Sequence, residues 1–181
     1  MAKNFTALKD FEPKGSHSYI IDTNMWVYLF SPIGSTQLKL QESIGKFIEN
    51  CQRVNAKLVI TSFIVAEFFH VTLGFSFDDW VREQKSSSTF KIKKDYRPTN
   101  EYKESIEFIT STIGKICEIA TPQQDKFETI NLNNILKNCF HAEFFDNHTL
   151  ELSNENGWII VTNDRDLLDH PDRKAMIVMP G

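Results

Sequence analysis

Two short apolar stretches, near opposite ends of the chain, each run directly into a carboxylate. Residues 18–24 read Ser-Tyr-Ile-Ile-Asp-Thr-Asn, and residues 158–164 read Trp-Ile-Ile-Val-Thr-Asn-Asp. Short runs of β-branched and aromatic residues favour buried strands. In open α/β sheets, ligands bind outside the carboxyl ends of the strands. The pattern therefore predicts that Asp22 and Asp164 lie at one edge of a sheet and suggests a metal site there.

Helices and strands alternate between these two stretches. Apolar residues at three- and four-residue steps predict an amphipathic helix over 36–55. A strand at 57–60 leads into a helix over 63–75 that is apolar on nearly every side, which predicts that it is buried. We expect further strands at 116–120 and 175–179, and further helices at about 98–115, 121–137 and 141–154. This alternation is typical of an α/β fold with a mainly parallel sheet covered on both faces.

The length of 181 residues suits a single domain. We expect residues 1–17 to form a weakly ordered N-terminal extension, and residues 78–98 to form an exposed basic insertion. Within that insertion Lys91, Lys93 and Lys94 lie between two aromatic residues, a pattern that suits nucleic-acid phosphates and bases. A solvated loop is the alternative interpretation of the same run.

The composition narrows the class of protein. The net charge of −4 provides no global basic field, which argues against a sequence-reading DNA-binding protein but leaves room for an enzyme with a local basic patch. The three cysteines lack zinc-site spacing, and we expect buried, reduced thiols and a cytoplasmic location. Neither a secretory signal nor an apolar run of about 18 residues is present, so no membrane span is expected.

Four carboxylates are embedded in apolar sequence, namely Asp22, Glu67, Asp146 and Asp164. If they converge, they cannot all ionise without a counter-charge, because neighbouring carboxylates raise one another's pKa. Divalent cations would resolve the conflict, and an all-oxygen set of side chains suits Mg²⁺ or Mn²⁺.

Four motifs, in this order, resemble those of PIN-domain nucleases. They are Ile-Asp-Thr-Asn ending at Asn24, Thr-Ser-x-x-x-x-Glu ending at Glu67, Asp-Asn-His-Thr-Leu-Glu-Leu starting at Asp146, and Val-Thr-Asn-Asp-Arg-Asp-Leu around Asp164. The resemblance covers residues 18–180. It implies a three-layer, Rossmann-like fold and a Mg²⁺- or Mn²⁺-dependent ribonuclease that hydrolyses phosphodiester bonds.

The resemblance also implies roles and partners. Asp22, Glu67 and Asp146 would bind or position metal ions, and Asp164 would hold a second ion or orient the first through water. Small members of the family include VapC-type toxins of toxin–antitoxin pairs, which implies RNA as the substrate, an antitoxin protein as a partner and a homodimer.

Four further polar residues belong to the expected site. Asn24 and Asn163 would fix the orientation of the carboxylates by hydrogen bonding. Thr162 would contact water or phosphate. Asp166 is expected to cap a helix N-terminus, with a place in the site as the alternative.

Two other functions compete with the nuclease. A non-catalytic PIN-like module would use the groove and the basic insertion to hold RNA or a protein. A phosphatase of the haloacid-dehalogenase type also has an Asp at the end of its first strand, but that chemistry needs Asp-x-Asp, and Asn24 occupies the second place.

Overall fold

The structure, a computed structural model, describes residues 5–31, 37–84 and 89–180. Its centre is one sheet in which every pairing is parallel, in the order β1-β6-β5-β2-β3-β4. The strands are β1 (Thr6–Ala7), β2 (Ser18–Ile21), β3 (Lys57–Ile60), β4 (Thr121–Pro122), β5 (Ile159–Val161) and β6 (Ile177–Met179). The predicted α/β fold with a mainly parallel sheet is confirmed.

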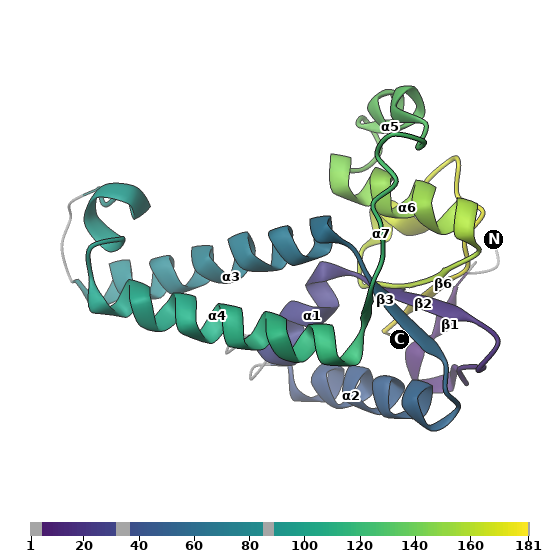
Figure 1. Cartoon of the computed structure of the whole chain (residues 1–181), viewed down its shortest axis with the longest axis horizontal. Coiled ribbons are helices and arrows are strands. Elements are labelled where there is room, and N and C mark those ends of the chain that lie inside the picture. The colour runs from purple at the N-terminus through teal and green to yellow at the C-terminus, as the bar shows by residue number, and fades with distance from the viewer. Residues whose placement is uncertain (1–4, 32–36, 85–88, 181) are drawn as a thin grey trace.

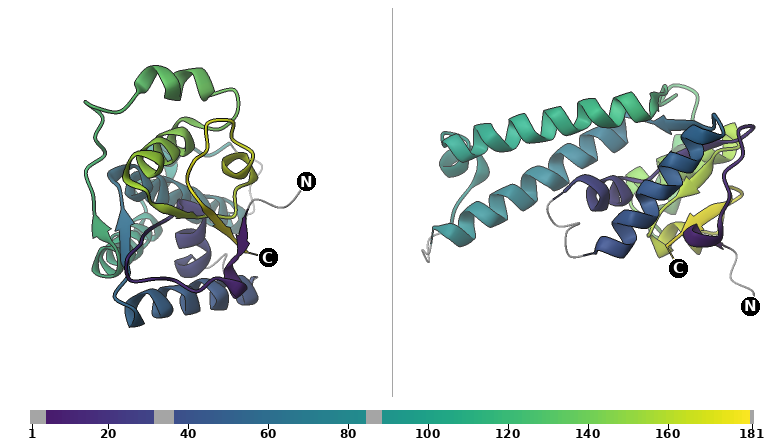
Figure 2. Two further views of the ribbon diagram at one scale, coloured as in Figure 1. Left: turned by 90° about the vertical axis from the view of Figure 1, so that its right-hand side faces the viewer. Right: turned by 90° about the horizontal axis from the view of Figure 1, so that it is seen from below.

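Helices cover both faces of the sheet and make three layers (Figure 1). Helix α2 (Leu38–Arg53) lies on one face, and α6 (Phe144–Asn156) lies on the other, as the end-on view of Figure 2 shows. The apolar stripe predicted for α2 is the reason it packs there, since Ile44, Phe47, Ile48 and Cys51 are its buried residues. Helix α6 is capped by Gly157, whose φ of 66° lies in the left-handed region that glycine adopts readily.

The strand order reverses beside β2. From β2 the chain moves outward to β3 and β4, and it then returns to place β5 against the other side of β2. Ile21 is in register with Val161, and the next backbone amide, that of Asp22, donates to the Val161 carbonyl at 3.0 Å. Such a reversal leaves a crevice at the carboxyl ends of the two strands, which is where open α/β sheets bind ligands.

Helices α3 (Ser62–Glu83) and α4 (Asn100–Ile119) form an antiparallel arm that extends away from the sheet (Figures 1 and 2). The helix predicted over 63–75 therefore continues through the first part of the predicted basic insertion. Trp80 is only 8% exposed and holds this continuation in the apolar core. Beyond it, one π-helical turn, η3 (Ile92–Tyr96), precedes α4, while residues 85–88 of the predicted insertion lie outside the described residues.

Two predicted elements between 116 and 137 are wrong. The strand predicted over 116–120 is instead the last turn of α4 and its C-cap, because Ile116 continues the buried helical face formed by Ile109 and Thr112. The helix predicted from residue 121 begins only with α5 (Leu132–Asn138). Pro122 belongs instead to the edge strand β4, where a missing N–H is tolerated.

The predicted weakly ordered extension does not hold for residues 5–17. Strand β1 pairs with β6, Leu8 is 4% exposed, and the Phe11 ring lies 5.9 Å from that of Tyr19. Phe11 also contacts Phe47 of α2, so this segment covers the sheet edge and one end of the core. Residues 1–4 of the predicted extension lie outside the described residues.

The cysteines differ in part from their prediction. Cys51 is buried, but Cys117 and Cys139 are exposed, and all three are free thiols. Apolar neighbours in the sequence do not predict burial of Cys117 and Cys139, because successive residues in and beside a helix point in different directions. Within the described part of the chain, no helix combines the length and the apolar content needed to cross a membrane.

Candidate acidic site at the reversal of strand order

One cavity of about 380 Å³ collects carboxylates from four parts of the chain. Asp22 is at the N-terminus of α1 (Thr23–Phe30), Glu67 is on α3, and Asp146 is in the first turn of α6. Asp164 caps the short helix α7 (Arg165–Leu168) after β5. The structure thus brings the four predicted catalytic residues to one cavity, together with Glu143 and Asp166, which also line it.

Asp22 is the most tightly held of these carboxylates. Its Oδ1 accepts the backbone amide of Thr23 at 2.7 Å, and its Oδ2 accepts the hydroxyl of Thr162 at 2.6 Å. Burial raises the pKa of Asp22 to about 6, against the Thr162 hydrogen bond, and the neighbouring charges of Glu67 and Asp164 add to the rise. Asp22 is therefore a fixed, desolvated carboxylate.

Thr162 has a different role from the predicted one. It was expected to contact water or phosphate, but it has no exposed surface. Besides donating to Asp22, its hydroxyl accepts the backbone amide of Asp164 at 2.9 Å. Because one side chain bonds both acidic segments, Thr162 sets the position of Asp22 relative to Asp164.

Glu67 is held by Thr23, a residue for which the sequence predicted no role. The hydroxyl of Thr23 donates to Glu67 Oε2 at 2.6 Å. Thr23 follows directly after Asp22, so the end of β2 orients two carboxylates. The position of Thr23, a hydroxyl residue directly after the Asp at the end of a strand, is the sequence feature that could have indicated this role.

Asp146 carries the largest perturbation in the site. Burial raises its pKa to about 8, and the charges of Asp22, Asp164, Glu67 and Glu143 act in the same direction. At neutral pH, in the absence of a cation, Asp146 therefore keeps its proton. A strongly shifted pKa caused by burial together with specific neighbouring charges is typical of functional sites.

The residues after β5 are arranged differently from their prediction. Asp164 itself caps α7, since its Oδ1 accepts the Asp166 amide at 2.8 Å, and Asp166 lines the cavity instead of capping. Asn163 is exposed and does not line the cavity, so the role predicted for it in holding the carboxylates is not supported by its position. Successive residues in this turn point in different directions, which spacing alone could not resolve.

Asn24 lines the cavity from the first turn of α1, two residues after Asp22. Its Oδ1 is buried and has no hydrogen-bond partner among the described residues. A buried carbonyl oxygen without a donor costs free energy, about 1–3 kcal/mol, so the position calls for a donor or a cation.

The donor chemistry suits a hard divalent cation, although the side chains as they stand do not enclose one. In the described parts of the chain, no group of three or more His, Cys, Asp or Glu side chains is arranged to hold a metal ion. The cavity nevertheless offers carboxylate oxygens and the unpaired Asn24 oxygen, and it raises the pKa of Asp22 and Asp146. These oxygen donors are the type that Mg²⁺ and Mn²⁺ prefer.

Part of the wall of the same cavity is apolar. It consists of Val27 and Tyr28 from α1, and Val71 and Phe75 from α3. Val71 and Phe75 follow Glu67 at four-residue steps, so one stripe of α3 changes from a carboxylate to apolar side chains. The cavity therefore has room for a ligand with a charged part and a flat or apolar part.

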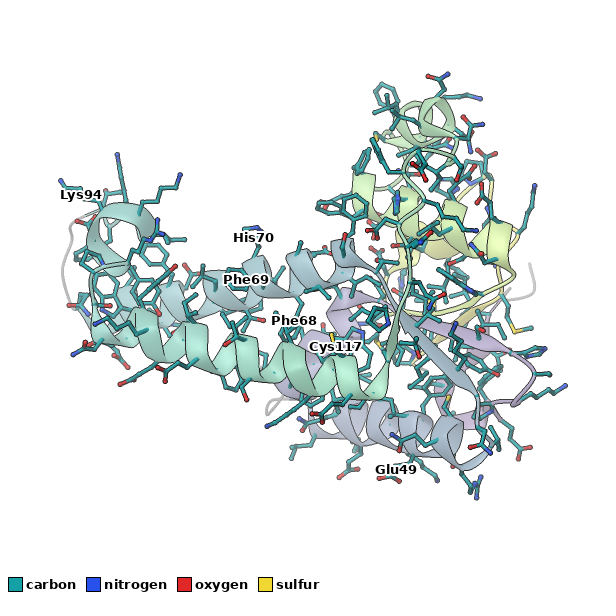
Figure 3. The ribbon with its side chains drawn as sticks, viewed as in Figure 1. Glu49, Phe68, Phe69, His70, Lys94 and Cys117 are labelled. Atoms are coloured by element: carbon teal, nitrogen blue, oxygen red, sulfur yellow. The ribbon has the colours of Figure 1, made fainter. Side chains whose placement is uncertain are left out.

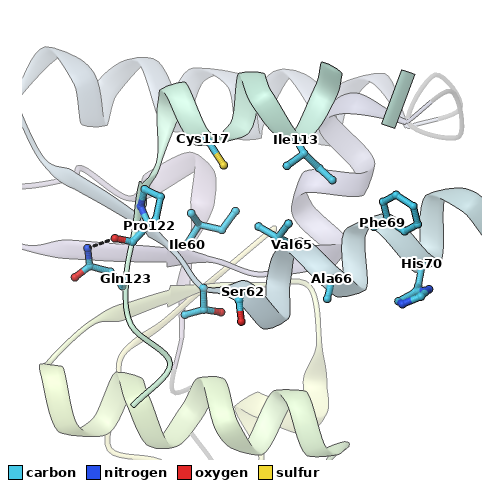
Figure 4. Close-up of a pocket in the computed structure, with 11 residues that line it drawn as sticks. Ile60, Ser62, Val65, Ala66, Phe69, His70, Ile113, Cys117, Pro122 and Gln123 are labelled. Carbon is cyan, nitrogen blue, oxygen red and sulfur yellow. Dashed lines mark hydrogen bonds between the residues drawn. The ribbon is translucent and has the colours of Figure 1, made fainter. Parts of the chain in front are cut away.

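A larger cavity of about 580 Å³ lies on another side of α3 (Figure 4). Its walls are mainly apolar, with Ile60, Val65, Phe69 and Ile113 among the lining residues, and no carboxylate lines it. His70, only three residues after Glu67, faces this groove and not the acidic cavity. This groove offers no carboxylate that could hold a divalent cation.

The predicted RNA-binding lysines are remote from the acidic cavity. Lys91, Lys93 and Lys94 are exposed at the outer end of the α3–α4 arm, and Lys94 projects away from it (Figure 3). They do not line the cavity. A single ligand that contacts both the lysines and the acidic cavity must therefore be long.

Comparisons with known proteins leave the family open. No model of a protein family matches the chain, and no curated protein matches it. Among solved structures, the chain is similar to that described as "Crystal structure of PAE2754 from Pyrobaculum aerophilum", with 15% sequence identity and a TM-score of 0.48 over 93% of this chain and 88% of that chain. A likeness of this extent carries no argument about function.

Proposed function

We propose that the protein is a Mg²⁺- or Mn²⁺-dependent endoribonuclease whose active site is the acidic cavity. The observation that carries this proposal is that the cavity gathers six carboxylates at the reversal of strand order. Such crowding is unfavourable without cations. The proposal agrees with the resemblance of the four motifs to PIN-domain nucleases.

In this proposal Asp22, Glu67, Asp146 and the Asn24 oxygen would hold a divalent ion, and Asp164 would hold a second ion or orient the first through water. A bound divalent ion supplies a water of lowered pKa and neutralises charge on a phosphodiester. The residues of the chain do the positioning, because Thr162 and Thr23 restrict Asp22 and Glu67 to the orientations set by the two hydroxyl hydrogen bonds.

Proton movement is the second contribution of the site. Asp146 keeps its proton at neutral pH, because burial and neighbouring charges raise its pKa to about 8. Binding of a cation then requires this proton to leave, so metal affinity should rise with pH across this range. The apolar wall with Tyr28 and Phe75 would contact a base or ribose next to the reacting phosphate.

The deciding experiment is cleavage of labelled single-stranded RNA in Mg²⁺, Mn²⁺ and EDTA. We expect metal-dependent cleavage by the wild type and a loss of more than about 100-fold in Asp22→Asn and in Asp146→Asn. The matched control is Glu49→Gln, an exposed acid on α2 (Figure 3), which should cleave like the wild type.

Two outcomes would contradict the proposal. RNA that is bound but never cleaved, with affinity unchanged in Asp22→Asn, would establish a non-catalytic RNA-binding module. Cleavage that persists in EDTA would exclude a metal-dependent mechanism. An antitoxin partner, a homodimer and a cytoplasmic location stay predictions, which co-purification, analytical ultracentrifugation and cell fractionation would test.

A further inference from the structure

The outer end of the α3–α4 arm is a rigid platform for exposed cations. Lys91, Lys93, Lys94 and Arg97 are all exposed there. The only acidic residue within this stretch, Asp95, is engaged locally, since its Oδ2 accepts the Lys91 amide at 2.8 Å. No salt bridge involves these four cations in the described residues, where the ion pair on the arm joins Arg82 to Asp79.

An aromatic core beneath the cations fixes their positions. The Trp80 ring lies 5.1 Å from the Phe90 ring and 5.2 Å from the Tyr96 ring, measured between ring centroids. Tyr96 is 1% exposed, contacts Tyr102, and hydrogen-bonds Ser105 on α4 at 2.7 Å between the two hydroxyl oxygens. A solvated loop would need no such core, so the platform holds its charges in place for a ligand.

Acidic residues lie close to these cations at the outer end of the arm. Asp79, Glu83, Glu101 and Glu104 line a shallow hollow beside Trp80 and Tyr96. These acids repel a polyanion from the hollow, whereas the cations attract it. The binding surface is thereby restricted to the cations of η3 and its two neighbours.

We propose that this arm end, formed by Lys91, Lys93, Lys94 and Arg97, is a second RNA-binding site that grips the phosphates of a long RNA whose other part lies in the acidic cavity. The proposal rests on the proposed nuclease function. Along α3, Glu67 and Glu83 are about 24 Å apart at roughly 1.5 Å per residue. A single strand with about 3.4 Å between stacked nucleotides needs about seven of them to cover that length.

The separation determines how the two sites can cooperate. It exceeds the Debye length, about 8 Å at physiological ionic strength, so the field of the lysines does not reach the carboxylates. The arm end can act on the reaction only by touching the same molecule. It therefore selects RNA by length, and short oligonucleotides reach the cavity without its help.

The test measures RNA binding apart from cleavage. In an Asp22→Asn background, the triple variant Lys91→Gln, Lys93→Gln, Lys94→Gln is titrated with labelled single-stranded RNA of about 20 and about 5 nucleotides at several salt concentrations. We expect about 10- to 100-fold weaker binding of the long RNA, a salt slope lower by up to about 2, and no change for the short RNA.

The control variant removes the same charge elsewhere, by changing Lys39, Lys46 and Lys57 to Gln; these exposed lysines lie on or beside α2. Equal losses in both triple variants, or undiminished long-RNA binding in the arm variant, would overturn the proposal. Undiminished RNA binding together with loss of an acidic protein partner would assign the platform to that partner instead. Absence of metal-dependent cleavage by the wild type would refute the nuclease and not the platform, because binding is read separately.

Discussion

The acidic cavity and the end of the α3–α4 arm hold like charges under opposite conditions. In the cavity, carboxylates are desolvated, and burial raises the pKa of Asp22 and Asp146. At the arm end, the lysines are exposed above an aromatic core. Buried like charges therefore cost stability and require a counter-ion. Exposed like charges cost little, and the packing beneath them determines where they lie.

The largest effect on stability is expected from removing that packing. Trp80→Ala should lower the free energy of unfolding by about 3–5 kcal/mol, because it leaves a cavity among Phe77, Phe90 and Tyr96. Denaturant unfolding measures this loss. The control is Phe108→Ala on the same arm, where the ring is 40% exposed and should matter little. An unchanged stability in Trp80→Ala would show that the arm end is not part of the cooperative fold.

The next largest effect is a gain in stability, expected from a substitution in the acidic cavity. The folded state binds a proton at Asp146 up to about pH 8, whereas the unfolded chain loses it near pH 3.8, so metal-free stability falls as pH rises between these values. Asp146→Asn removes this loss and should stabilise the protein at pH 8 by a few kcal/mol, because each pH unit between the two pKa values contributes up to about 1.4 kcal/mol.

The measurement is urea unfolding in EDTA at pH 4 and pH 8. At pH 4 the variant and the wild type should nearly coincide. Glu155→Gln, an exposed acid on the same helix, is the control and should show no such difference. An Asp146→Asn protein that is less stable than the wild type at pH 8 would show that the cavity does not crowd its carboxylates.

A smaller loss is expected from the hydroxyl that joins the two acidic segments. Thr162→Val keeps the shape but removes the donor to Asp22 and the acceptor for the Asp164 amide, which should cost about 1–3 kcal/mol. Thermal unfolding reads this cost, with Thr110→Val on the exposed face of α4 as the control. Equal stability of the two variants would mean that water replaces the Thr162 bonds.

The smallest effect on stability is expected from the lysines themselves. The Lys91, Lys93, Lys94 to Gln variant should change the free energy of unfolding by less than about 0.5 kcal/mol, since the side chains are exposed. Differential scanning calorimetry checks this. A large destabilisation would mean that the lysine stems pack on the aromatic core, and the contrast between the two regions would weaken.

The sheet and the gathering of carboxylates could be predicted because both follow from local patterns. A run such as Tyr-Ile-Ile before Asp22 gives the strand and the place where its carboxylate emerges, and parallel pairing then brings Asp22 and Asp164 to the same edge. Glu67 stood out because a charge in an apolar helix needs a partner. These inferences use only burial and strand period, whereas the place of Asp146 beside them was implied by the resemblance of the four motifs.

The failures lie where tertiary packing overrides the local pattern. The segment 116–120 is β-branched and apolar enough for a strand, but α4 continues to Ile119 because Ile116 extends the buried helical face formed by Ile109 and Thr112. The packing within the predicted basic insertion was also missed. Trp80 and Tyr96 lie on separate helical segments, so the local pattern does not show that their rings are in contact. The predicted contact of Thr162 with water or phosphate is wrong because sequence spacing shows that a hydroxyl is near the site but not which group it bonds.

The pairing of β1 with β6 has a consequence for the order of events during synthesis. The segment around Thr6 is made long before its pairing partner, Val178, which lies far later in the sequence. This edge of the sheet therefore closes only when translation of these residues is over, and such distant pairings form late in folding. The acidic cavity likewise lacks Asp164 until β5 has emerged, so a growing chain on the ribosome carries an incomplete set of carboxylates.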